Sequence, residues 1–339
     1  MGRTLIMGIL NVTPDSFSDG GRFLAESSET APGTSTVGGE VDVASAVAEA
    51  LRMHAEGADI IDVGGESTRP GSDPTSPEEE QRRILPVLER LFQELEPGPG
   101  SNGRPQLSVD TRRASTARAA LELAGARAPE LIINDVSGLL TEEEMPAVIA
   151  EAGAQIVITH NRGDSKTMQS RAEYDDVVAE VVAELKEVRQ RYLDAGVPRE
   201  QIILDPGIGF AKTHEQNWEL VRRLGELTRS GHRVLLGASR KGFLRALLDG
   251  IRPPDEEPGR DTSGHDAADR DTATAVLSGI AASLGLWAVR VHAVRPNREA
   301  VEVLTRLGAE SAHCPPAATE PSSAAGFAYV SGPWRDGAR

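Results

Sequence analysis

The sequence has one cysteine, few aromatic residues and no long apolar segment. The single cysteine, Cys314, excludes a disulfide within the chain and a zinc site built from cysteines, and it is typical of a reducing compartment. No apolar run approaches the roughly 18 residues that a membrane-spanning helix needs. A first apolar strand is expected within a few residues of Met1, so we expect no signal or transit peptide. These absences predict a soluble cytoplasmic protein with no membrane partner.

Positive charge is also scarce, with 36 basic residues against 52 acidic ones and a formal net charge of −16. Such a surface repels nucleic acid and anionic membranes, so we expect neither as a partner. An anionic substrate would have to be met by cations that are gathered at one place. The hydrophobic content of 39% is normal for a globular protein, so the chain can bury a large core.

Short apolar runs alternate with amphipathic stretches along the chain, which is the pattern of a parallel α/β fold. Strands are predicted at Leu5–Leu10, Asp59–Val63, Gln106–Val109, Leu131–Asn134, Gln155–Thr159, Ile202–Leu204, Arg233–Leu236 and Ala288–Val291. Helices are predicted at Val41–Glu56, Pro77–Leu95, Ala114–Ala124, Glu142–Glu151, Ala172–Ala195, His214–Thr228, Arg270–Leu284 and Asn297–Leu307, with a short extra helix at Lys241–Leu248. Eight strand–helix repeats favour a closed TIM (β/α)8 barrel over an open sheet. The glycine fingerprint of a dinucleotide-binding fold does not follow the first strand.

We predict one barrel domain over residues 1–309 and a low-complexity C-terminal tail over residues 310–339. The tail is rich in Pro, Ala, Ser and Gly without any period, which is typical of a disordered segment. Two further stretches, Leu24–Glu40 and Arg252–Ala268, fall outside the strand–helix alternation and are interpreted as loop insertions.

Polar residues stand at the carboxyl ends of all eight predicted strands, where the active site of such a barrel lies. In chain order they include Asn11, Asp62, Asp110, Asn134, His160, Asp205, Lys241 and His292. Some could simply cap the following helix, as the residue types of Asp110 and Ser137 allow. Lys241, Arg290 and His292 are not capping residues, and the i, i+2 spacing of the last two puts both on one face of the last strand. We therefore interpret this end of the barrel as a ligand site that includes cations.

The loop after the first strand contains further polar residues. It holds Asn11, Asp15 and Asp19, and it also holds Phe17 in a chain that is only 4% aromatic. The whole string Gly8–Gly21 resembles the N-terminal signature of dihydropteroate synthase, a folate-pathway family. Further matching stretches are Asp59–Gly71, Ser108–Thr111, Ile133–Gly138, Asp205–Thr213, Gly237–Leu244 and Arg290–His292. The resemblance covers about residues 4 to 308.

The resemblance implies a TIM-barrel transferase. Enzymes of this family condense (7,8-dihydropterin-6-yl)methyl diphosphate with 4-aminobenzoate, which gives 7,8-dihydropteroate and diphosphate, and they use Mg2+. The aniline nitrogen displaces the diphosphate at a pterin carbon that becomes cation-like in this family, and we expect no covalent enzyme intermediate. Sulfonamides compete with 4-aminobenzoate in this family, and its members are often homodimers, so we expect both properties here.

The resemblance also assigns roles to individual residues. The family's pterin-binding positions correspond to Asp110, Asn134, Asp205 and Lys241, with Phe210 beside them. Its diphosphate-binding positions correspond to Arg290, His292 and Thr68. Its magnesium position corresponds to Asn11. The loops that close over 4-aminobenzoate would contribute Phe17, Thr68, Arg69 and Pro70. Asp19 of the first loop is a further expected substrate-binding residue. The residues expected to carry the catalysis are Lys241, Arg290, His292 and Asp110.

Three residues depart from the family pattern. Gly242 stands where many relatives carry a serine whose hydroxyl would meet the carboxylate of 4-aminobenzoate. Ala293 replaces an acidic residue that would orient His292, and Thr159 replaces a common methionine. These departures leave open a non-catalytic paralogue that binds pterin without releasing diphosphate.

A second alternative is a pterin-binding methyltransferase that works with a corrinoid protein. That superfamily shares the barrel and the pocket of Asp and Asn residues. Its chemistry has no need for Arg290 and His292, for Lys241 with the residues before it, or for Asn11. Their presence favours the synthase.

Overall fold

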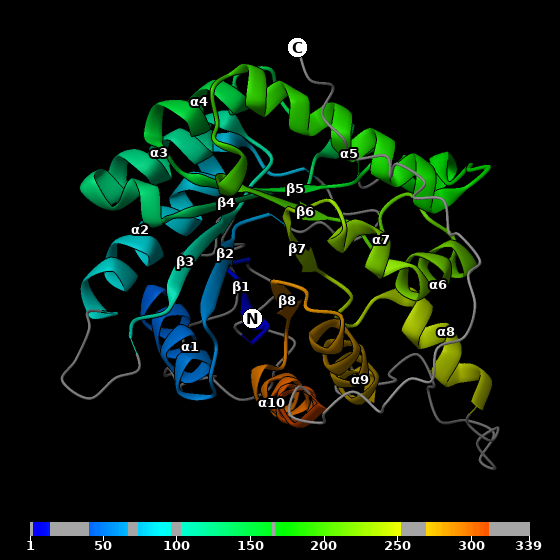
Figure 1. Ribbon diagram of the computed structural model, residues 1–339. Helices are drawn as coiled ribbons and strands as arrows, with labels where there is room; N and C mark the ends of the chain where they lie inside the picture. Colours follow the sequence, from blue (N-terminus) through cyan, green and yellow to red (C-terminus); the bar gives the residue numbers. More distant parts are fainter. Residues whose placement is uncertain are drawn as a thin grey trace, which may run out of the picture.

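The computed structural model describes residues 3–13, 41–66, 74–95, 103–164, 167–251 and 269–311. Within these residues, eight parallel strands close into a barrel in which each strand pairs with the next and β8 pairs with β1. Figure 1 shows the strands at the centre and the helices around them. The predicted TIM barrel is therefore confirmed. The two predicted insertions and the tail beyond residue 311 lie outside the described residues, so the predicted domain boundary stays a prediction.

Apolar runs that are buried on both faces form the strands. They are β1 Leu5–Asn11, β2 Ile60–Gly64, β3 Gln106–Asp110, β4 Ile132–Asp135, β5 Gln155–Thr159, β6 Ile202–Asp205, β7 Arg233–Leu236 and β8 Ala288–Val291. Each strand prediction is confirmed to within one residue at either end.

Amphipathic helices cover the outside of the barrel. They are α1 Val43–Ala55, α2 Pro77–Glu94, α3 Ala114–Ala124, α4 Met145–Ala152, α5 Val177–Asp194, α6 His214–Arg222, α7 Leu224–Thr228, α8 Gly242–Ile251, α9 Asp269–Ser283 and α10 Val294–Ser311. Short 3-10 helices occur at η1 Gly125–Glu130, η2 Gly138–Leu140, η3 Met168–Arg171 and η4 Arg199–Gln201.

The helix bounds were predicted less well than the strand bounds. Three predicted helices differ from the structure by three or four residues at an end: Glu142–Glu151 is Met145–Ala152, Lys241–Leu248 is Gly242–Ile251 and Asn297–Leu307 is Val294–Ser311. Two others differ more. The helix expected from Ala172 begins at Val177, because the Asp176 side chain accepts hydrogen bonds of 3.0 and 3.1 Å from two N–H groups of the first turn. The single helix expected over His214–Thr228 is divided into α6 and α7 at Arg223. Hydrophobic periodicity continues across both points, so it does not reveal either boundary.

The barrel interior changes from apolar to polar toward the carboxyl ends of the strands. The apolar layer consists of Met7, Ile60, Ile132, Val157, Ile203, Leu235 and Ala288, all fully buried. Side chains alternate between the two faces of a strand, so the residues two positions further along also face the interior. These are Ile9, Asp62, Asn134, Thr159, Asp205, Gly237 and Arg290. The fold therefore brings polar groups from different strands to one end of the barrel.

None of the described residues belongs to a helix that is long and apolar enough to cross a membrane.

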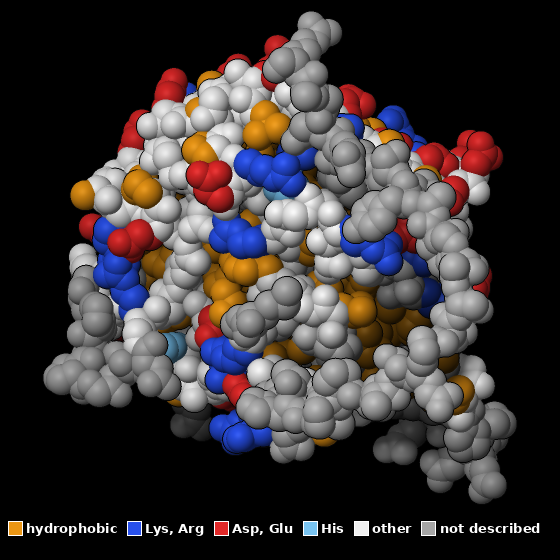
Figure 2. All heavy atoms as spheres, in the orientation of Figure 1, with side chains coloured by type: hydrophobic (Ala, Val, Ile, Leu, Met, Phe, Trp, Pro, Cys, Tyr) orange, Lys and Arg blue, Asp and Glu red, His pale blue; other side chains and the backbone are white. Residues whose placement is uncertain are grey.

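Figure 2 shows lysine and arginine side chains spread among acidic ones on one face of the molecule. The net negative charge of the chain therefore does not prevent cations from meeting an anion locally.

Candidate active site

Arg290 lies at the centre of the polar layer. Its guanidinium donates from Nε to Asp62 Oδ2 and from Nη2 to Asp110 Oδ2, both at 2.6 Å. Asp62 Oδ2 also accepts a hydrogen bond of 3.1 Å from Asn134 Nδ2. One charged network thus joins β2, β3, β4 and β8 across the barrel interior. Three predicted site residues, Asp110, Asn134 and Arg290, are brought together by it.

The Asp110 carboxyl is nearly enclosed. Burial raises the pKa of Asp110 to about 7, against the effect of the Arg290 charge, and the charge of Asp62 raises the pKa further. Gly64 leaves room for this side chain, since a Cβ at that position would lie 3.3 Å from Asp110 Cβ. A buried carboxyl with a raised pKa therefore stands beside a permanent cation.

Strand β6 delivers Asp205 to the same end of the barrel. Its Oδ1 accepts a hydrogen bond of 2.7 Å from the Gly207 N–H. Burial raises the pKa of Asp205 to about 6, although the Gly207 N–H, Lys241 and Arg290 all oppose the rise. The chain turns sharply here, because Gly207 has a φ of 67° and a Cβ on it would lie 1.8 Å from the His160 carbonyl oxygen. Only glycine fits this turn.

Lys241 faces this turn from the start of α8. Its Nζ lies 4.1 Å from the centroid of the Phe210 ring, so a cation–π contact holds the ammonium. Burial lowers the pKa of Lys241 to about 8, and Arg290 lowers it further, while two carboxylates oppose the change. Arg240, the preceding residue, has a φ of 57° and donates two hydrogen bonds of 2.8 Å to Asp271 of α9. The ion pair of Arg240 with Asp271 thus fixes the backbone next to Lys241 and the position from which its side chain extends.

A second buried lysine supports the loop after β6. Lys212 Nζ donates to the carbonyl oxygens of Gly207 and Phe210 at 3.0 and 2.9 Å, and to His160 Nδ1 at 2.8 Å. Since Nδ1 accepts, the ring is neutral and its Nε2 donates to Glu184 Oε2 at 2.9 Å. Burial lowers the pKa of His160 to about 4 and that of Lys212 to about 7. His160, which we expected at the ligand site, therefore serves the support of the loop.

His292 is oriented by Ser239, which follows β7. The backbone N–H of His292 donates to Ser239 Oγ at 3.2 Å, and His292 Nδ1 lies 2.9 Å from the same oxygen. The Ser239 hydroxyl can donate its proton to Nδ1, which makes Nε2 the N–H donor of the ring. Ser239 therefore supplies the orientation that Ala293 cannot supply.

Asn11 ends β1 in register with Gly64, and the alternation along the strand places it on the interior face. An amide oxygen is a hard ligand that suits Mg2+. Among the described residues, no group of three or more His, Cys, Asp or Glu side chains could hold a metal ion. A magnesium ion at this position would therefore need most of its oxygen ligands from water and from a bound ligand.

Residues 7–292 match the family described as pterin binding enzyme. The chain belongs to this pterin-binding enzyme family. Among its relatives, the dihydropteroate synthase of Mycobacterium leprae is 44% identical over 304 residues, which are 88% of this chain and 92% of that protein.

Solved structures of dihydropteroate synthases share the fold of this pterin-binding enzyme. The protein of Anaplasma phagocytophilum, with bound 6-hydroxymethylpterin-monophosphate, gives a TM-score of 0.71 at 30% identity and covers 90% of this chain and 100% of that one. The protein of Thermus thermophilus, in complex with 4-aminobenzoate, gives 0.68 at 37% identity and covers 90% and 95%. The present chain thus spans nearly the full length of these relatives.

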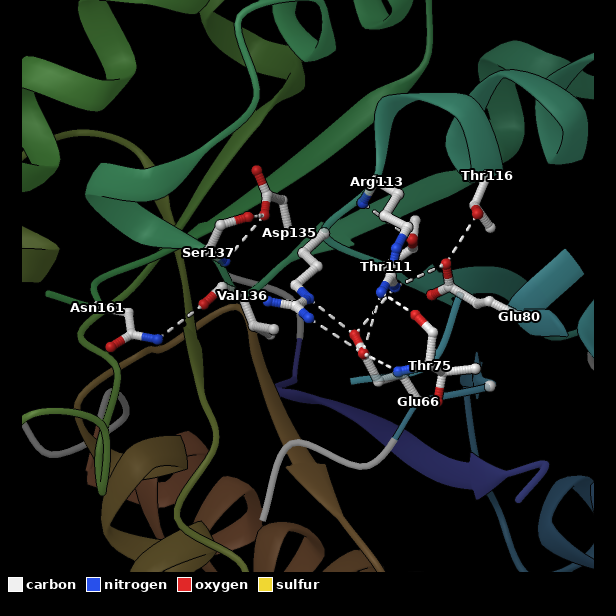
Figure 3. A network of polar contacts seen from close by, with 12 residues as sticks. Glu66, Thr75, Glu80, Thr111, Arg113, Thr116, Asp135, Val136, Ser137 and Asn161 are labelled. Atoms are coloured by element: carbon white, nitrogen blue, oxygen red, sulfur yellow. Dashed lines mark hydrogen bonds and ion pairs between the residues drawn. The ribbon is translucent and has the colours of Figure 1, made fainter. Parts of the chain in front are cut away.

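In this pterin-binding enzyme, both ends of the loop after β2 are anchored to the same carboxylate. Glu66, before the loop, accepts a hydrogen bond of 2.9 Å from the N–H of Thr75, after the loop. Arg112 and Arg113 donate to Glu66 at 2.8 to 3.1 Å. Arg113 also donates to the Thr75 carbonyl and, at 3.2 Å, to Glu80. Figure 3 shows Arg113 between the two glutamates.

A second network in Figure 3 joins Asp135, at the end of β4, to Ser137. Asp135 accepts hydrogen bonds from the Ser137 N–H at 2.9 Å, from the Ser137 hydroxyl, and from Thr141 Oγ1 at 2.9 Å. The Ser137 side chain makes no capping hydrogen bond, and the residue before α3 is Arg113, not Asp110. Capping therefore explains neither Asp110 nor Ser137.

Five predicted contacts lie outside the described residues, and their roles stay predictions: Phe17, Asp19, Thr68, Arg69 and Pro70. Three residues of the observed network had no predicted role, namely Asp62, Lys212 and Ser239. Asp62 carried a usable signal, since a charged residue in an otherwise apolar buried strand must find a partner. Lys212 and Ser239 carried none, because loop positions show no periodicity that predicts direction.

Proposed function

We propose that this chain is a dihydropteroate synthase that joins (7,8-dihydropterin-6-yl)methyl diphosphate to 4-aminobenzoate and releases diphosphate. The observation that carries the proposal is the charged layer at one end of the barrel, where Asp110 and Asp205 share the field of Arg290 and Lys241. Carboxylates suit the donor-rich edge of a pterin, and cations suit a diphosphate. The relatives named above support this reading over other pterin-binding functions.

The pterin would lie against the carboxylates and the amide. Asp205 is fixed by the Gly207 N–H, and its charged form accepts N–H donors of the guanidine-like edge. Asn134 donates to Asp62, and its Oδ1 has no hydrogen-bond partner among the described residues. A buried acceptor of this kind favours a ligand that donates to it. Lys241 would donate to an acceptor of the heterocycle, with Phe210 behind it.

The diphosphate would lie at Arg290 and His292. Two guanidinium nitrogens of Arg290 are engaged by carboxylates, and Ser239 fixes the ring of His292 with its N–H on Nε2. In the reaction, the C–O bond to the diphosphate breaks and its electron pair leaves with the diphosphate, and the aniline nitrogen then forms the C–N bond to the cation-like pterin carbon. Donors placed at that oxygen lower the barrier because charge develops there. The aniline nitrogen is neutral at pH 7 and loses its proton after attack, so no dedicated base is required.

We further propose Asn11 as the protein ligand of a magnesium ion that binds together with the diphosphate. The donor set fits this role, since one amide oxygen is a suitable ligand but cannot hold the ion by itself. When bound, the ion would supply further neutralisation of the leaving group.

The second substrate, 4-aminobenzoate, is assigned to the loops after β1 and β2, with Phe17, Thr68, Arg69 and Pro70 as its proposed contacts and Asp19 as a further substrate-binding residue. The anchoring of the β2 loop at Glu66 and Thr75 supports this assignment, because it fixes where the loop leaves and rejoins the barrel. Sulfonamides are expected to compete there.

We propose a homodimer in the cytoplasm, without nucleic-acid or membrane partners. Two stripes of exposed apolar residues support the dimer: Val276, Ile280 and Leu284 run along α9 to its end, and Val303 and Leu307 lie on α10. These two helices lie side by side on the outside of the barrel, as Figure 1 shows, so a contact there would leave the carboxyl ends of the strands open.

The decisive experiment measures diphosphate release by the purified protein with magnesium and the dihydropterin diphosphate, with and without 4-aminobenzoate. We expect release that depends on 4-aminobenzoate and that yields dihydropteroate in equal amount. Tight pterin binding without any release would instead identify the non-catalytic paralogue. Diphosphate release that does not depend on 4-aminobenzoate would mean that the pterin site is intact and the 4-aminobenzoate site is defective.

A further inference from the structure

Four buried polar atoms inside the barrel have no hydrogen-bond partner among the described residues. They are Asp62 Oδ1 on β2, Ser108 Oγ on β3, Asn134 Oδ1 on β4 and Thr159 Oγ1 on β5. A buried polar atom without a partner is costly to the empty protein. Three of them, on Asp62, Asn134 and Thr159, lie two residues beyond the apolar layer and indicate a surface that is arranged for a ligand, whereas Ser108 lies with the apolar layer.

Thr159 and Ser108 have no role in the proposed function, and of these two Thr159 is the one that lies beyond the apolar layer. It is 1% exposed and ends β5 in register with Asp205 of β6. Neighbouring strands lie about 4.8 Å apart, so the two side chains are direct neighbours on the interior face. Val157, two residues earlier, belongs to the apolar interior layer, which fixes the direction of Thr159 toward the interior.

We propose that the Thr159 hydroxyl is a specificity-determining contact of the pterin site. This inference rests on the proposed function. It places the hydroxyl beside Asp205, along the amino and amide edge of the heterocycle. A hydroxyl donates and accepts at once, so it pairs with either an N–H or the carbonyl of that edge. The empty protein tolerates the unpaired hydroxyl because the ligand satisfies it.

The proposal predicts that stability and affinity change in opposite directions. Thr159→Val keeps the shape of the side chain and removes the unpaired hydroxyl. The melting temperature of the empty protein should therefore rise by about 2–4 °C. The affinity for 6-hydroxymethylpterin should fall about 3- to 10-fold, since one net hydrogen bond is lost. The KM for 4-aminobenzoate should not change.

Two further variants complete the test. Thr159→Ser keeps the hydroxyl and should retain the affinity of the natural protein. Ser108→Ala removes another unpaired hydroxyl, but Ser108 pairs in register with Ile132 of the apolar layer, below the expected ligand. This control should raise the melting temperature without weakening pterin binding.

An unchanged pterin affinity in Thr159→Val would overturn the proposal, as would an equal loss in Ser108→Ala. The result is separable from the proposed function. If the natural protein neither binds pterin nor releases diphosphate, the proposed function fails before any variant is compared. If the natural protein is active and Thr159→Val matches it, only the role of Thr159 is rejected.

Discussion

At the scale of single residues, burial controls the proton affinity of the groups that face the ligand. Asp205 is 5% exposed, and its pKa of about 6 lies well above the usual range of an aspartate. Three nearby cations and one N–H group limit this rise but do not cancel it. The charge of this carboxyl therefore changes near pH 6.

Pterin affinity should consequently depend on pH. The charged form of Asp205 accepts the N–H groups of the pterin edge, so affinity should fall by about tenfold per pH unit below about 6. Neutral 6-hydroxymethylpterin is the suitable probe, because it has no phosphate to titrate. Its binding, measured by calorimetry from about pH 7.5 to about pH 5, checks the prediction, and Asp205→Asn should bind weakly with a flat profile. A flat profile in the natural protein would contradict it.

The same shift has an opposite consequence for folding. Because the folded pKa of Asp205 lies above the unfolded value, its contribution to stability is complete below about pH 4 and is lost as pH rises through about 6. The empty site therefore disfavours the charged, ligand-binding form, and keeping Asp205 charged above about pH 6 costs some folding free energy.

Gly242 offers a second prediction at this scale. A Cβ there would lie 3.7 Å from His214 Nε2, which is ordinary contact, and Gly242 is the first residue of α8. A serine therefore fits. Gly242→Ser should lower the KM for 4-aminobenzoate about 2- to 10-fold by adding one hydrogen bond to its carboxylate. Steady-state kinetics check this prediction, with Gly242→Ala as the control. The alanine adds the Cβ and its helix propensity but no hydroxyl, so a lower KM in the serine variant alone is due to the hydroxyl.

At the scale of elements, the loop from β6 to α6 joins support and ligand site. Gly207, Gly209 and Ala211 all have positive φ, at 67°, 84° and 47°. Such a backbone persists only where its surroundings hold it. Lys212, 2% exposed, holds two of the loop carbonyls from behind, while Phe210 meets Lys241 in front.

Replacing Lys212 should therefore damage both stability and binding. Lys212→Met leaves two carbonyls and His160 Nδ1 without their donor, which should cost about 2–3 kcal/mol of unfolding free energy. Pterin affinity should also fall about tenfold or more, because Asp205 and Phe210 lose their positions. Arg189→Met removes another buried cation, 1% exposed on α5, and serves as the control. Equal pterin affinity in the two variants after correction for folding would reject the positioning role.

At the scale of the whole molecule, the polar residues at the carboxyl ends of the strands lie apart from the exposed apolar residues on the outer helices. Polar groups occupy the carboxyl ends of the strands, while exposed apolar side chains stand on α9 and α10. The proposed dimer contact can therefore be altered without changing the proposed active site.

The dimer proposal is tested on these outer helices. The double substitution Val276→Glu and Val303→Glu places charges at two positions that are 60% and 57% exposed, so the single chain should fold normally. Sedimentation should give the natural protein twice the 36.0 kDa mass of one chain, and the variant one chain. Leu123→Glu on α3, where the side chain is 38% exposed, should leave the dimer intact. A natural protein that sediments as a monomer would contradict the proposal.

The sequence alone determined the barrel and the residue types at its active end. Every strand is a mainly apolar run, because a strand that is buried on both faces needs apolar side chains on both. The start and end of each run therefore predict the bounds of the strand. The polar residue after each run then falls at the same end, because parallel strands all point one way. Asp110, Asn134, Asp205 and Arg290 could be placed together on this ground.

Only the tertiary structure decided which groups pair. Nothing local in the chain joins Arg290 to Asp62, which is 228 positions away, or Lys212 to the loop carbonyls through a backbone with positive φ. His160 was expected at the ligand, but its peptide lies against Gly207 and its ring turns to Glu184. Hydrogen bonds depend on direction and on distances of about 3 Å, and these are fixed by barrel closure rather than by sequence pattern.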